Sequence, residues 1–282
     1  MKNYSLPHYH IQKIEIHDFW RKYNIVWDNL HPDVNILVGI NGSGKTTLLR
    51  IIEAVSNPGS AQRKTMGKFG ISYVCITNDG GFYTKYENKA YSLQTNSLGN
   101  LISTISTFDV PVNKSKLKQD ESPLMLELRQ LILQTGTHSF NDYRLMATTS
   151  LSNAKEISER IKAFFAFIDN LFRNTGKKIE IDSTNNIVFK TDIGTITLEQ
   201  LSSGEKQLLL ILFKVFLMDN KPYVLLMDEP EISLHISWQQ DLIKTLRELN
   251  PNCQLIIATH SPSIFGKGWG DKVTFMEQLF QR

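Results

Sequence analysis

The sequence predicts an α/β fold in which a mixed sheet is flanked by helices, with an antiparallel β region and an inserted helical lobe. Two segments, residues 223–227 and 254–258, carry apolar runs without alternation, which are typical of strands buried on both faces of a parallel sheet. A third run, residues 34–38, leads directly into a glycine-rich loop and a helix. Between residues 124 and 173, apolar side chains recur at helical spacing, which predicts the lobe.

The remaining elements follow from local patterns. Four strands are expected in the N-terminal part, at residues 11–19, 25–27, 71–76 and 82–92. The last two are joined by the turn Asn78-Asp79-Gly80-Gly81. Two more strands are expected at 178–181 and 187–190, and helices at 46–55, 205–218 and 235–249.

These elements predict a single domain over residues 1–282. Its core comprises residues 1–110 and 178–282, and the helical lobe occupies about 111–177. The polar stretch 113–122 within the lobe is expected to be a loop.

Composition favours an ordinary soluble protein. Apolar residues make up 41% of the chain, charged residues 21%, and the net charge of +3 does not by itself indicate a nucleic-acid partner. Cys75 and Cys253 are expected to be free thiols in a reducing cytosol rather than a disulfide, and they cannot form a zinc site alone. The N-terminus lacks an apolar signal sequence, and the longest apolar stretch, 208–218, is too short to span a membrane. We therefore expect a cytoplasmic protein without a membrane partner.

The glycine-rich loop Gly39-Ile40-Asn41-Gly42-Ser43-Gly44-Lys45-Thr46 matches the full Walker A pattern. Its glycines would let backbone N–H groups approach phosphate oxygens, and its lysine would reach the β and γ phosphates. A hairpin turn at Asn41-Gly42 is the alternative, but a helix follows instead of a strand. The expected ATP-binding residues of this loop are Asn41, Gly42, Ser43, Gly44, Lys45, Thr46 and Thr47.

Asp228 and Glu229 end the apolar strand 223–227. Ligands of open parallel sheets bind at the carboxyl ends of the strands. Asp228 and the hydroxyl of Thr46 are therefore expected to hold Mg²⁺, and Glu229 to activate the attacking water. The alternative is that an acidic pair simply ends a strand at a turn.

Two further segments gain meaning only in combination with these motifs. Ser202, Ser203 and Gly204 precede a long helix, where they form either an anion site or a plain N-cap. His260 follows the strand 254–258 and is either structural or close to the γ-phosphate.

The order of these four motifs resembles that of the ABC-class ATPases, over residues 11–55 and 197–262. The resemblance implies a site shared by two subunits in a head-to-tail dimer. Ser202, Ser203 and Gly204 would contact ATP from the partner subunit, and His260 would sense the γ-phosphate. It therefore implies ATP and Mg²⁺ as cofactors, and a homodimer or higher homo-oligomer formed through ATP.

The chain is most similar to the branch containing RecF, the structural-maintenance-of-chromosomes (SMC) proteins and OLD nucleases. The signature reads LSSGEKQ, and His235 stands where transporters carry an aspartate. The run from Asp228 to His235, with Trp238-Gln239-Gln240 and Ala258–Pro262, resembles stand-alone ATPases of Septu, retron and PARIS anti-phage modules. The sequence lacks the long heptads of SMC proteins. After His260 it has too few residues for the nuclease domain of OLD proteins.

Two expected parts of an ABC site have no clear counterpart. Asp109 is the best substitute for the Q-loop glutamine, although a surface turn before Pro111 is an equal alternative. Phe19, Trp20 or Tyr23 would stack on the adenine, yet aromatic residues in such positions are more often part of a core.

The resemblance favours an ATPase that dimerises on ATP and controls a separate effector protein, for instance a nuclease, in anti-phage defence. A DNA-repair or DNA-tethering ATPase is the alternative, with a nucleic acid as partner. Lys114, Lys116 and Lys118 would then contact the nucleic acid, although a solvated charge run is the simpler interpretation. The signature and His235 disfavour a transporter subunit.

Overall fold

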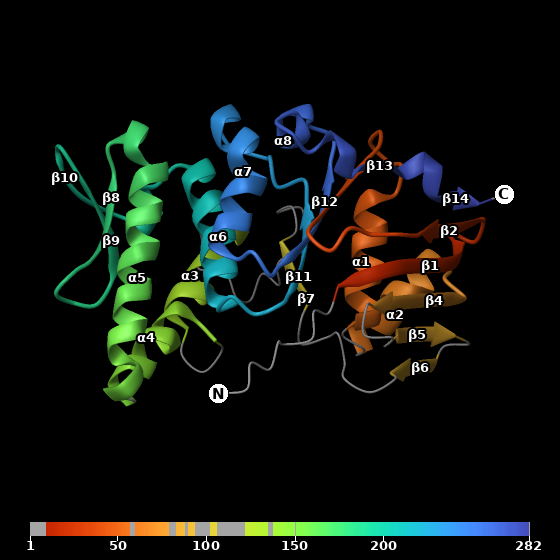
Figure 1. The fold of residues 1–282 in the computed structure, drawn as a ribbon, viewed down its shortest axis with the longest axis horizontal. Helices are drawn as coiled ribbons and strands as arrows, with labels where there is room; N and C mark the ends of the chain where they lie inside the picture. Colours follow the sequence, from red (N-terminus) through yellow and green to blue (C-terminus); the bar gives the residue numbers. More distant parts are fainter. Residues whose placement is uncertain are drawn as a thin grey trace. The chain divides into compact units, whose positions relative to one another are not determined.

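The computed structural model describes residues 10–56, 60–78, 83–87, 90–93, 102–105, 122–134, 138–149 and 151–281 (Figure 1). The chain divides into two compact units. One unit comprises residues 1–107 and 220–282, and the other comprises residues 108–219. The single domain expected from the sequence remains a prediction.

The first unit contains a five-stranded parallel sheet with the order β13-β3-β12-β11-β7. Its strands are β3 (Val34–Val38), β7 (Ile102–Ile105), β11 (Val224–Asp228), β12 (Gln254–Thr259) and β13 (Val273–Phe275). Every residue of β11 and β12 is buried, which confirms the interpretation of these apolar runs. Asp228 is level with Ala258, and Thr259 with Val38, so these three strands bring their carboxyl ends to one edge.

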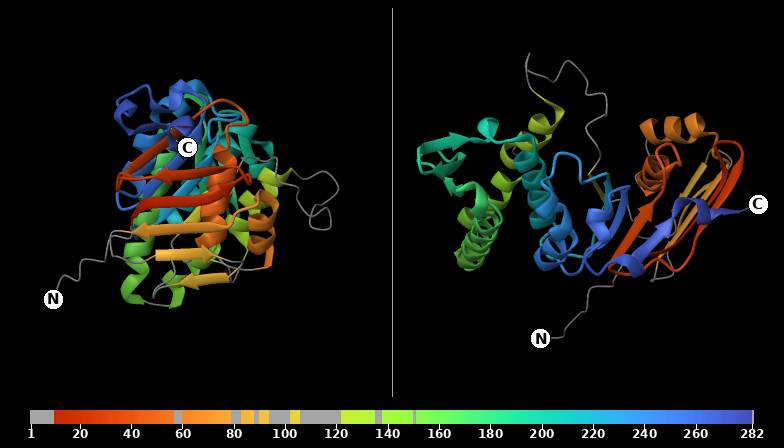
Figure 2. Two further views of the ribbon diagram at one scale, coloured as in Figure 1. Left: turned by 90° about the vertical axis from the view of Figure 1, so that its right-hand side faces the viewer. Right: turned by 90° about the horizontal axis from the view of Figure 1, so that it is seen from above.

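An antiparallel sheet with the order β14-β2-β1-β4-β5-β6 forms the rest of the β structure of this unit (Figure 2). Its strands are β1 (Ile11–Phe19), β2 (Tyr23–Trp27), β4 (Tyr73–Asn78), β5 (Tyr83–Glu87), β6 (Ala90–Leu93) and β14 (Phe280–Gln281). The single strand predicted over 82–92 is wrong, because β5 and β6 pair antiparallel with Glu87 opposite Ala90. Residues 79–81 of the predicted turn lie outside the described residues.

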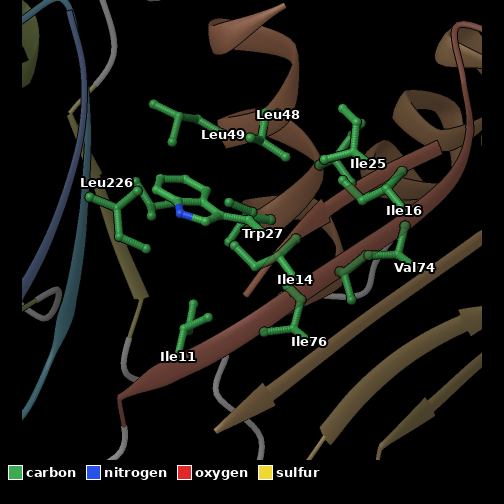
Figure 3. Close-up of a cluster of buried hydrophobic side chains, with 14 of the residues drawn as sticks. Ile11, Ile14, Ile16, Ile25, Trp27, Leu48, Leu49, Val74, Ile76 and Leu226 are labelled. Atoms are coloured by element: carbon green, nitrogen blue, oxygen red, sulfur yellow. The ribbon is translucent and has the colours of Figure 1, made fainter. Parts of the chain in front are cut away.

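Helix α1 packs against both sheets through one continuous apolar cluster. Figure 3 shows the indole of Trp27, on β2, pointing toward Leu226 of β11. The buried leucines and isoleucines of α1 belong to the same cluster, which fixes the helix that follows the glycine-rich loop. The helices of this unit are α1 (Lys45–Ser56), α2 (Ser60–Phe69), α7 (Ile236–Leu249) and α8 (Pro262–Phe265), with 3-10 turns η5 (Gly270–Lys272) and η6 (Met276–Leu279).

The second unit is built around four helices and a small antiparallel sheet with the order β10-β9-β8. Its elements are α3 (Pro123–Leu133), α4 (Phe140–Thr149), α5 (Leu151–Leu171), η3 (Arg173–Thr175), β8 (Lys178–Ile181), β9 (Ile187–Thr191), β10 (Gly194–Thr197), η4 (Leu198–Gln200) and α6 (Ser203–Leu217). Phe164 stacks on Phe216 with ring centroids 4.2 Å apart, and Phe140 meets Phe213 edge-on at 5.1 Å. This aromatic group gives the unit its own core.

Both cysteines are free thiols, as predicted, with Cys253 buried and Cys75 half-buried. In the part of the chain that the structure describes, no helix has the length and apolar character needed to cross a bilayer.

Candidate functional site

The glycine-rich loop lies between β3 and α1, in the strand–loop–helix setting expected from the sequence. Gly42 and Gly44 have positive φ angles of 81° and 107°, which other residues rarely adopt. A Cβ on Gly44 would lie 3.0 Å from ring atoms of Phe19 and Trp20. Gly44 thus lets the loop lie against the aromatic turn that follows β1.

Lys45 is buried and bends back over its own loop. Its Nζ donates to the carbonyl oxygens of Gly39 and Ile40, at 2.8 and 3.3 Å. The Ser43 Oγ atom is buried and has no hydrogen-bond partner among the described residues. A buried hydroxyl without a partner is rare in native proteins and indicates that the loop is shaped for a polar ligand.

Thr46 and Asp228 meet although 182 residues separate them. The Thr46 hydroxyl donates to Asp228 Oδ1 at 3.0 Å. Burial raises the pKa of the Asp228 carboxyl, the Thr46 hydrogen bond lowers it and the charge of Glu229 raises it, so the net pKa lies above the ordinary value. The structure therefore brings together the two residues predicted to hold the metal, and both offer the hard oxygen atoms that Mg²⁺ prefers.

Glu229 and His260 also meet at this edge of the parallel sheet. The Nδ1 atom of His260 lies 3.2 Å from Glu229 Oε1. Glu229 has a positive φ angle of 46°, a conformation that costs free energy in a residue other than glycine. Its backbone N–H donates to the carbonyl of Ala258 at 2.8 Å, which holds this turn on β12.

Two residues that no sequence motif marked, Glu231 and Gln239, hold the turn after Glu229 through hydrogen bonds. Buried Glu231 accepts a hydrogen bond from Thr259 Oγ1 at 2.6 Å and from the backbone N–H of His260 at 3.4 Å. Gln239 donates to the Glu231 carbonyl and accepts from the Ser261 hydroxyl at 3.1 Å. The position of Glu231 directly after Pro230 and before an apolar residue is the sequence feature that could have indicated its structural role.

The three signature residues lie at the start of α6, in the second unit. Ser202 is the N-cap, and its Oγ accepts from the backbone N–H of Glu205 at 3.2 Å. Glu205 in turn accepts from the Ser202 N–H at 2.9 Å, completing a capping box. Ser202 and Ser203 are exposed, whereas Gly204 is buried. The N-cap interpretation of Ser202 is therefore confirmed, and its hydroxyl proton remains available to donate.

A pocket of about 630 Å³ lies beside the glycine-rich loop, within the first unit. Trp20 lines it from the turn after β1, Tyr23 from the start of β2, Ile40 and Ser43 from the loop, and Phe280 from β14. This volume is in the range of small-molecule sites. Of the three candidate adenine platforms, Phe19 is fully buried and part of the core, whereas Trp20 and Tyr23 face the pocket.

Several predicted features lie outside the described residues, namely Asp109 and the lysines 114, 116 and 118. Among the described residues, no group of three or more histidine, cysteine, aspartate or glutamate side chains forms a metal cluster.

Comparison with protein families places this site in context. Residues 92–266, more than half of the chain, match the AAA_21 family, described as "AAA domain, putative AbiEii toxin, Type IV TA system". The chain belongs to the AAA_21 family of P-loop ATPases. The predicted resemblance to retron and Septu ATPases is confirmed, since relatives of this AAA_21 chain include two retron probable ATPases and the Septu protein PtuA.

Three curated relatives illustrate the kinds of protein to which this chain is similar. The Septu protein PtuA of Bacillus thuringiensis is 24% identical over 276 residues, covering 83% of this chain and 67% of PtuA. The "Retron Vc95 probable ATPase" of Vibrio cholerae is 26% identical over 55% of this chain and 30% of that protein. A spermidine/putrescine import ATP-binding protein, PotA, of an Aster yellows witches'-broom phytoplasma is 27% identical over 79% of this chain. The match spans 56% of the length of PotA, little more than half.

Solved structures confirm the fold class. An SMC head bound to the C-terminal winged-helix domain of ScpA superposes with a TM-score of 0.56, covering 92% of this chain and 91% of that one at 14% identity. An SMC head with an extended coiled coil, bound to a ScpA domain derived from Pyrococcus furiosus, gives 0.55 at 15% identity, covering 92% of each chain. The AAA_21 chain therefore has the α/β fold of an ATPase head.

Proposed function

We propose that this chain binds and hydrolyses ATP, forms ATP-bridged dimers and regulates a separate effector protein in anti-phage defence. The observation that carries the proposal is the meeting of Thr46 with Asp228 and of Glu229 with His260 at one edge of the parallel sheet. The first of these contacts joins residues 182 positions apart in sequence, and the second joins residues 31 positions apart.

Phosphate binding rests on the glycine-rich loop and the N-terminus of α1. Backbone N–H groups of Asn41–Thr47 would donate to phosphate oxygens, and the Ser43 hydroxyl would gain the partner it lacks. Lys45 would exchange its carbonyl partners for the β and γ phosphates. Thr46 and Asp228 would hold Mg²⁺, which neutralises charge on the phosphates when bound.

Hydrolysis rests on Glu229 and His260. Glu229 would accept a proton from the attacking water, because its carboxylate lies at the strand end beside Asp228. His260, in contact with Glu229 Oε1, would hold that carboxylate in place and contact the γ-phosphate. The strained backbone of Glu229 fits such a role, since strain of this kind is concentrated at functional sites.

The base of ATP would lie in the pocket beside the loop, with Trp20 or Tyr23 stacking on it. Trp20 also lies against Gly44 of the loop, which places an aromatic ring next to the phosphate site.

A second copy of the chain would complete the site from its signature segment. The start of α6 offers free N–H groups and the Ser202 hydroxyl, with Ser203 and Gly204 next to it. The capping box uses Ser202 Oγ as an acceptor, so its proton can be donated to a phosphate oxygen. Fold likeness to SMC heads and similarity to PtuA and retron ATPases support a switch that acts through partner proteins.

The Glu229→Gln variant tests this mechanism. It should retain ATP binding but lose hydrolysis, so that it accumulates as an ATP-bound dimer. Size-exclusion chromatography with light scattering, and nucleotide analysis of the dimer peak, measure this. Glu248→Gln, an exposed carboxylate on α7, is the matched control and should behave as the wild type. A Glu229→Gln protein that neither dimerises nor retains nucleotide would refute the ATP-bridged mechanism.

Similarity to PotA favours a second candidate function, that of an ATP-binding transporter subunit. A gene for a membrane permease next to this one would support it, and a neighbouring nuclease gene would support the defence module. Salt-sensitive DNA binding by Glu229→Gln would instead favour a DNA-tethering role.

A further inference from the structure

A glutamine on α7 makes three side-chain hydrogen bonds that the proposed function does not use. Gln239 lies in the first turn of this helix and is half-buried. Its Nε2 atom donates to the carbonyl oxygens of Glu231 and Leu234, at 3.3 and 3.0 Å. Its Oε1 atom accepts from the Ser261 hydroxyl at 3.1 Å. One side chain therefore joins the turn after β11 to the segment after β12.

These bonds close a ring of four residues. The Ser261 N–H donates to Thr259 Oγ1 at 3.0 Å, and the Thr259 hydroxyl donates to Glu231 Oε1 at 2.6 Å. Glu231 is joined to Gln239 through its carbonyl oxygen, and Gln239 is joined to Ser261 through the two side chains. His260 lies between two members of the ring in sequence, and its own N–H donates to Glu231 Oε1 at 3.4 Å. The ring therefore fixes the backbone on both sides of His260.

The side chains that depend on this backbone are exposed. The side chain of His260 is 47% exposed and that of Glu229 is 23% exposed, and His260 Nδ1 lies 3.2 Å from Glu229 Oε1. Holding two such side chains in one geometry costs conformational entropy. Backbone that is fixed beside both residues removes part of that cost. Because a displacement of about 1 Å at a reacting centre can lower a rate about a hundredfold, this fixation matters for hydrolysis.

The position of Gln239 suits a carboxamide. The two carbonyl oxygens need donors, whereas the Ser261 hydroxyl donates to an acceptor. A carboxamide offers two donors and an acceptor in one planar group. The two carbonyl oxygens also determine which end of the amide carries the nitrogen, since a carbonyl cannot donate. A glutamate of the same size would accept from Ser261, but in its ionised form it has no proton to donate to the carbonyls.

We propose that Gln239 is a positioning residue for ATP hydrolysis, which holds the turn after Glu229 and the backbone of His260 in one geometry. This inference rests on the proposed ATP hydrolysis and deepens it, because it adds a residue of α7 to the site. In the described part of the chain, Gln239 makes no hydrogen bond to either side chain of the Glu229–His260 pair. It therefore acts through Glu231 and Ser261.

Steady-state kinetics of Gln239→Ala tests the proposal. We expect kcat for ATP hydrolysis to fall about tenfold and KM for ATP to stay within about twofold of the wild type, because the glycine-rich loop is untouched. Gln240→Ala provides the control. Gln240 is the next residue on α7, and among the described residues it bonds neither to the turn after β11 nor to Ser261. Its kcat and KM should equal those of the wild type.

The pH profile of Gln239→Glu separates positioning from a general loss of stability. The carboxyl group has the size of the amide but donates only when it is protonated. Its ordinary pKa is about 4.3, and the two carbonyl oxygens that face it favour the protonated form. The ratio of kcat in this variant to kcat in the wild type should therefore rise about threefold as the pH falls from about 8 to about 5. Gln239→Ala cannot regain the bond, so its ratio should stay constant.

Contrary results would affect the two proposals differently. A kcat of Gln239→Ala equal to that of the wild type, or an equal loss in Gln240→Ala, would overturn the positioning role alone. A ratio for Gln239→Glu that does not change with pH would overturn it as well. Wild-type protein that binds ATP without hydrolysing it would instead refute the proposed hydrolysis, and the positioning role with it.

Discussion

Glu231 connects the turn after β11 to the end of β12 through its hydrogen bonds with Thr259 and His260. Its Oε1 atom takes both bonds, while Oε2 is buried without a hydrogen-bond partner among the described residues. Thr259 Oγ1 also accepts from the Ser261 N–H at 3.0 Å. The Thr259 hydroxyl therefore links Glu231 to the residue that follows His260. We therefore propose that Glu231 positions Glu229 and His260.

Replacing Glu231 by alanine should lower kcat for ATP hydrolysis by about ten- to a hundredfold, because Glu229 and His260 lose their fixed geometry. The KM for ATP should change little, since Lys45 and the glycine-rich loop are untouched. Steady-state kinetics measures both constants.

A double-mutant cycle separates positioning from general damage. Thr259→Val removes the hydroxyl partner, and the double variant should lose no more activity than Glu231→Ala alone. Additive losses would show that the two side chains act independently, contrary to a shared positioning role.

The residues of the site that sequence reasoning found share one property: each belongs to a short local pattern. Lys45, Thr46, Asp228 and Glu229 fall in runs whose chemistry depends on spacing alone. Phe280, which lines the pocket, could not be found in this way, because its place depends on the pairing of β14 with β2 across the chain. Likewise, the adenine platform stayed ambiguous until burial separated Phe19 from Trp20 and Tyr23.

At the scale of the element, the start of α6 depends on an ion pair that its sequence does not reveal. Lys177 Nζ donates to Glu205 Oε1 at 2.8 Å, and Glu205 caps the helix through Ser202. Burial raises the pKa of the Glu205 carboxyl, but hydrogen bonds from Lys177 and the Ser202 backbone lower it more, so the pKa lies below its ordinary value. The ionised carboxylate therefore stabilises the fold.

This ion pair predicts a pH dependence of stability. The contribution of Glu205 is fully present above the unfolded pKa of about 4.3 and is lost as pH falls through the lower folded pKa. Urea unfolding between about pH 6 and pH 3 should therefore show a smaller loss of unfolding free energy in Glu205→Gln than in the wild type. Lys177→Met should cost about 1–3 kcal/mol at neutral pH and move the transition to higher pH.

Lys190→Met is the matched control, because Lys190 pairs with Glu180 at an exposed site in the same unit. Its pH profile should follow that of the wild type. A Glu205→Gln profile parallel to the wild type would show that the carboxylate does not titrate in this window.

Elements whose apolar residues recur with a strong period were predicted well, whereas elements that form only by pairing with another part of the chain were not. The strands 11–19, 34–38 and 178–181 have the predicted bounds. β14 has only two residues, and nothing in its sequence marks it as a strand apart from its pairing with β2. α2 is rich in polar residues and lacks a clear apolar stripe, so its sequence resembles a loop.

At the scale of the molecule, the first unit joins both sheets and α1 in one apolar cluster. A ligand held by the glycine-rich loop at the start of α1 therefore stabilises that cluster as well as its own site. At a hundredfold excess over Kd, MgATP should add about 2.7 kcal/mol, which corresponds to roughly 5 °C in Tm.

Lys45→Met should abolish most of this shift while leaving the Tm of the free protein close to that of the wild type. Among the described residues, its side chain bonds only to carbonyls of its own loop, and methionine preserves its volume. Differential scanning calorimetry with and without MgATP measures both quantities. An equal shift in the variant would mean that ATP binds elsewhere.

β14 also has a consequence for solubility. It covers part of the outer edge of β2, where a five-residue strand would otherwise present unpaired N–H and C=O groups to other chains. With only two residues, it is too short to serve as a template for a further strand. Detachment of β14 would expose an edge suited to strand addition, so the same two residues guard the sheet against aggregation.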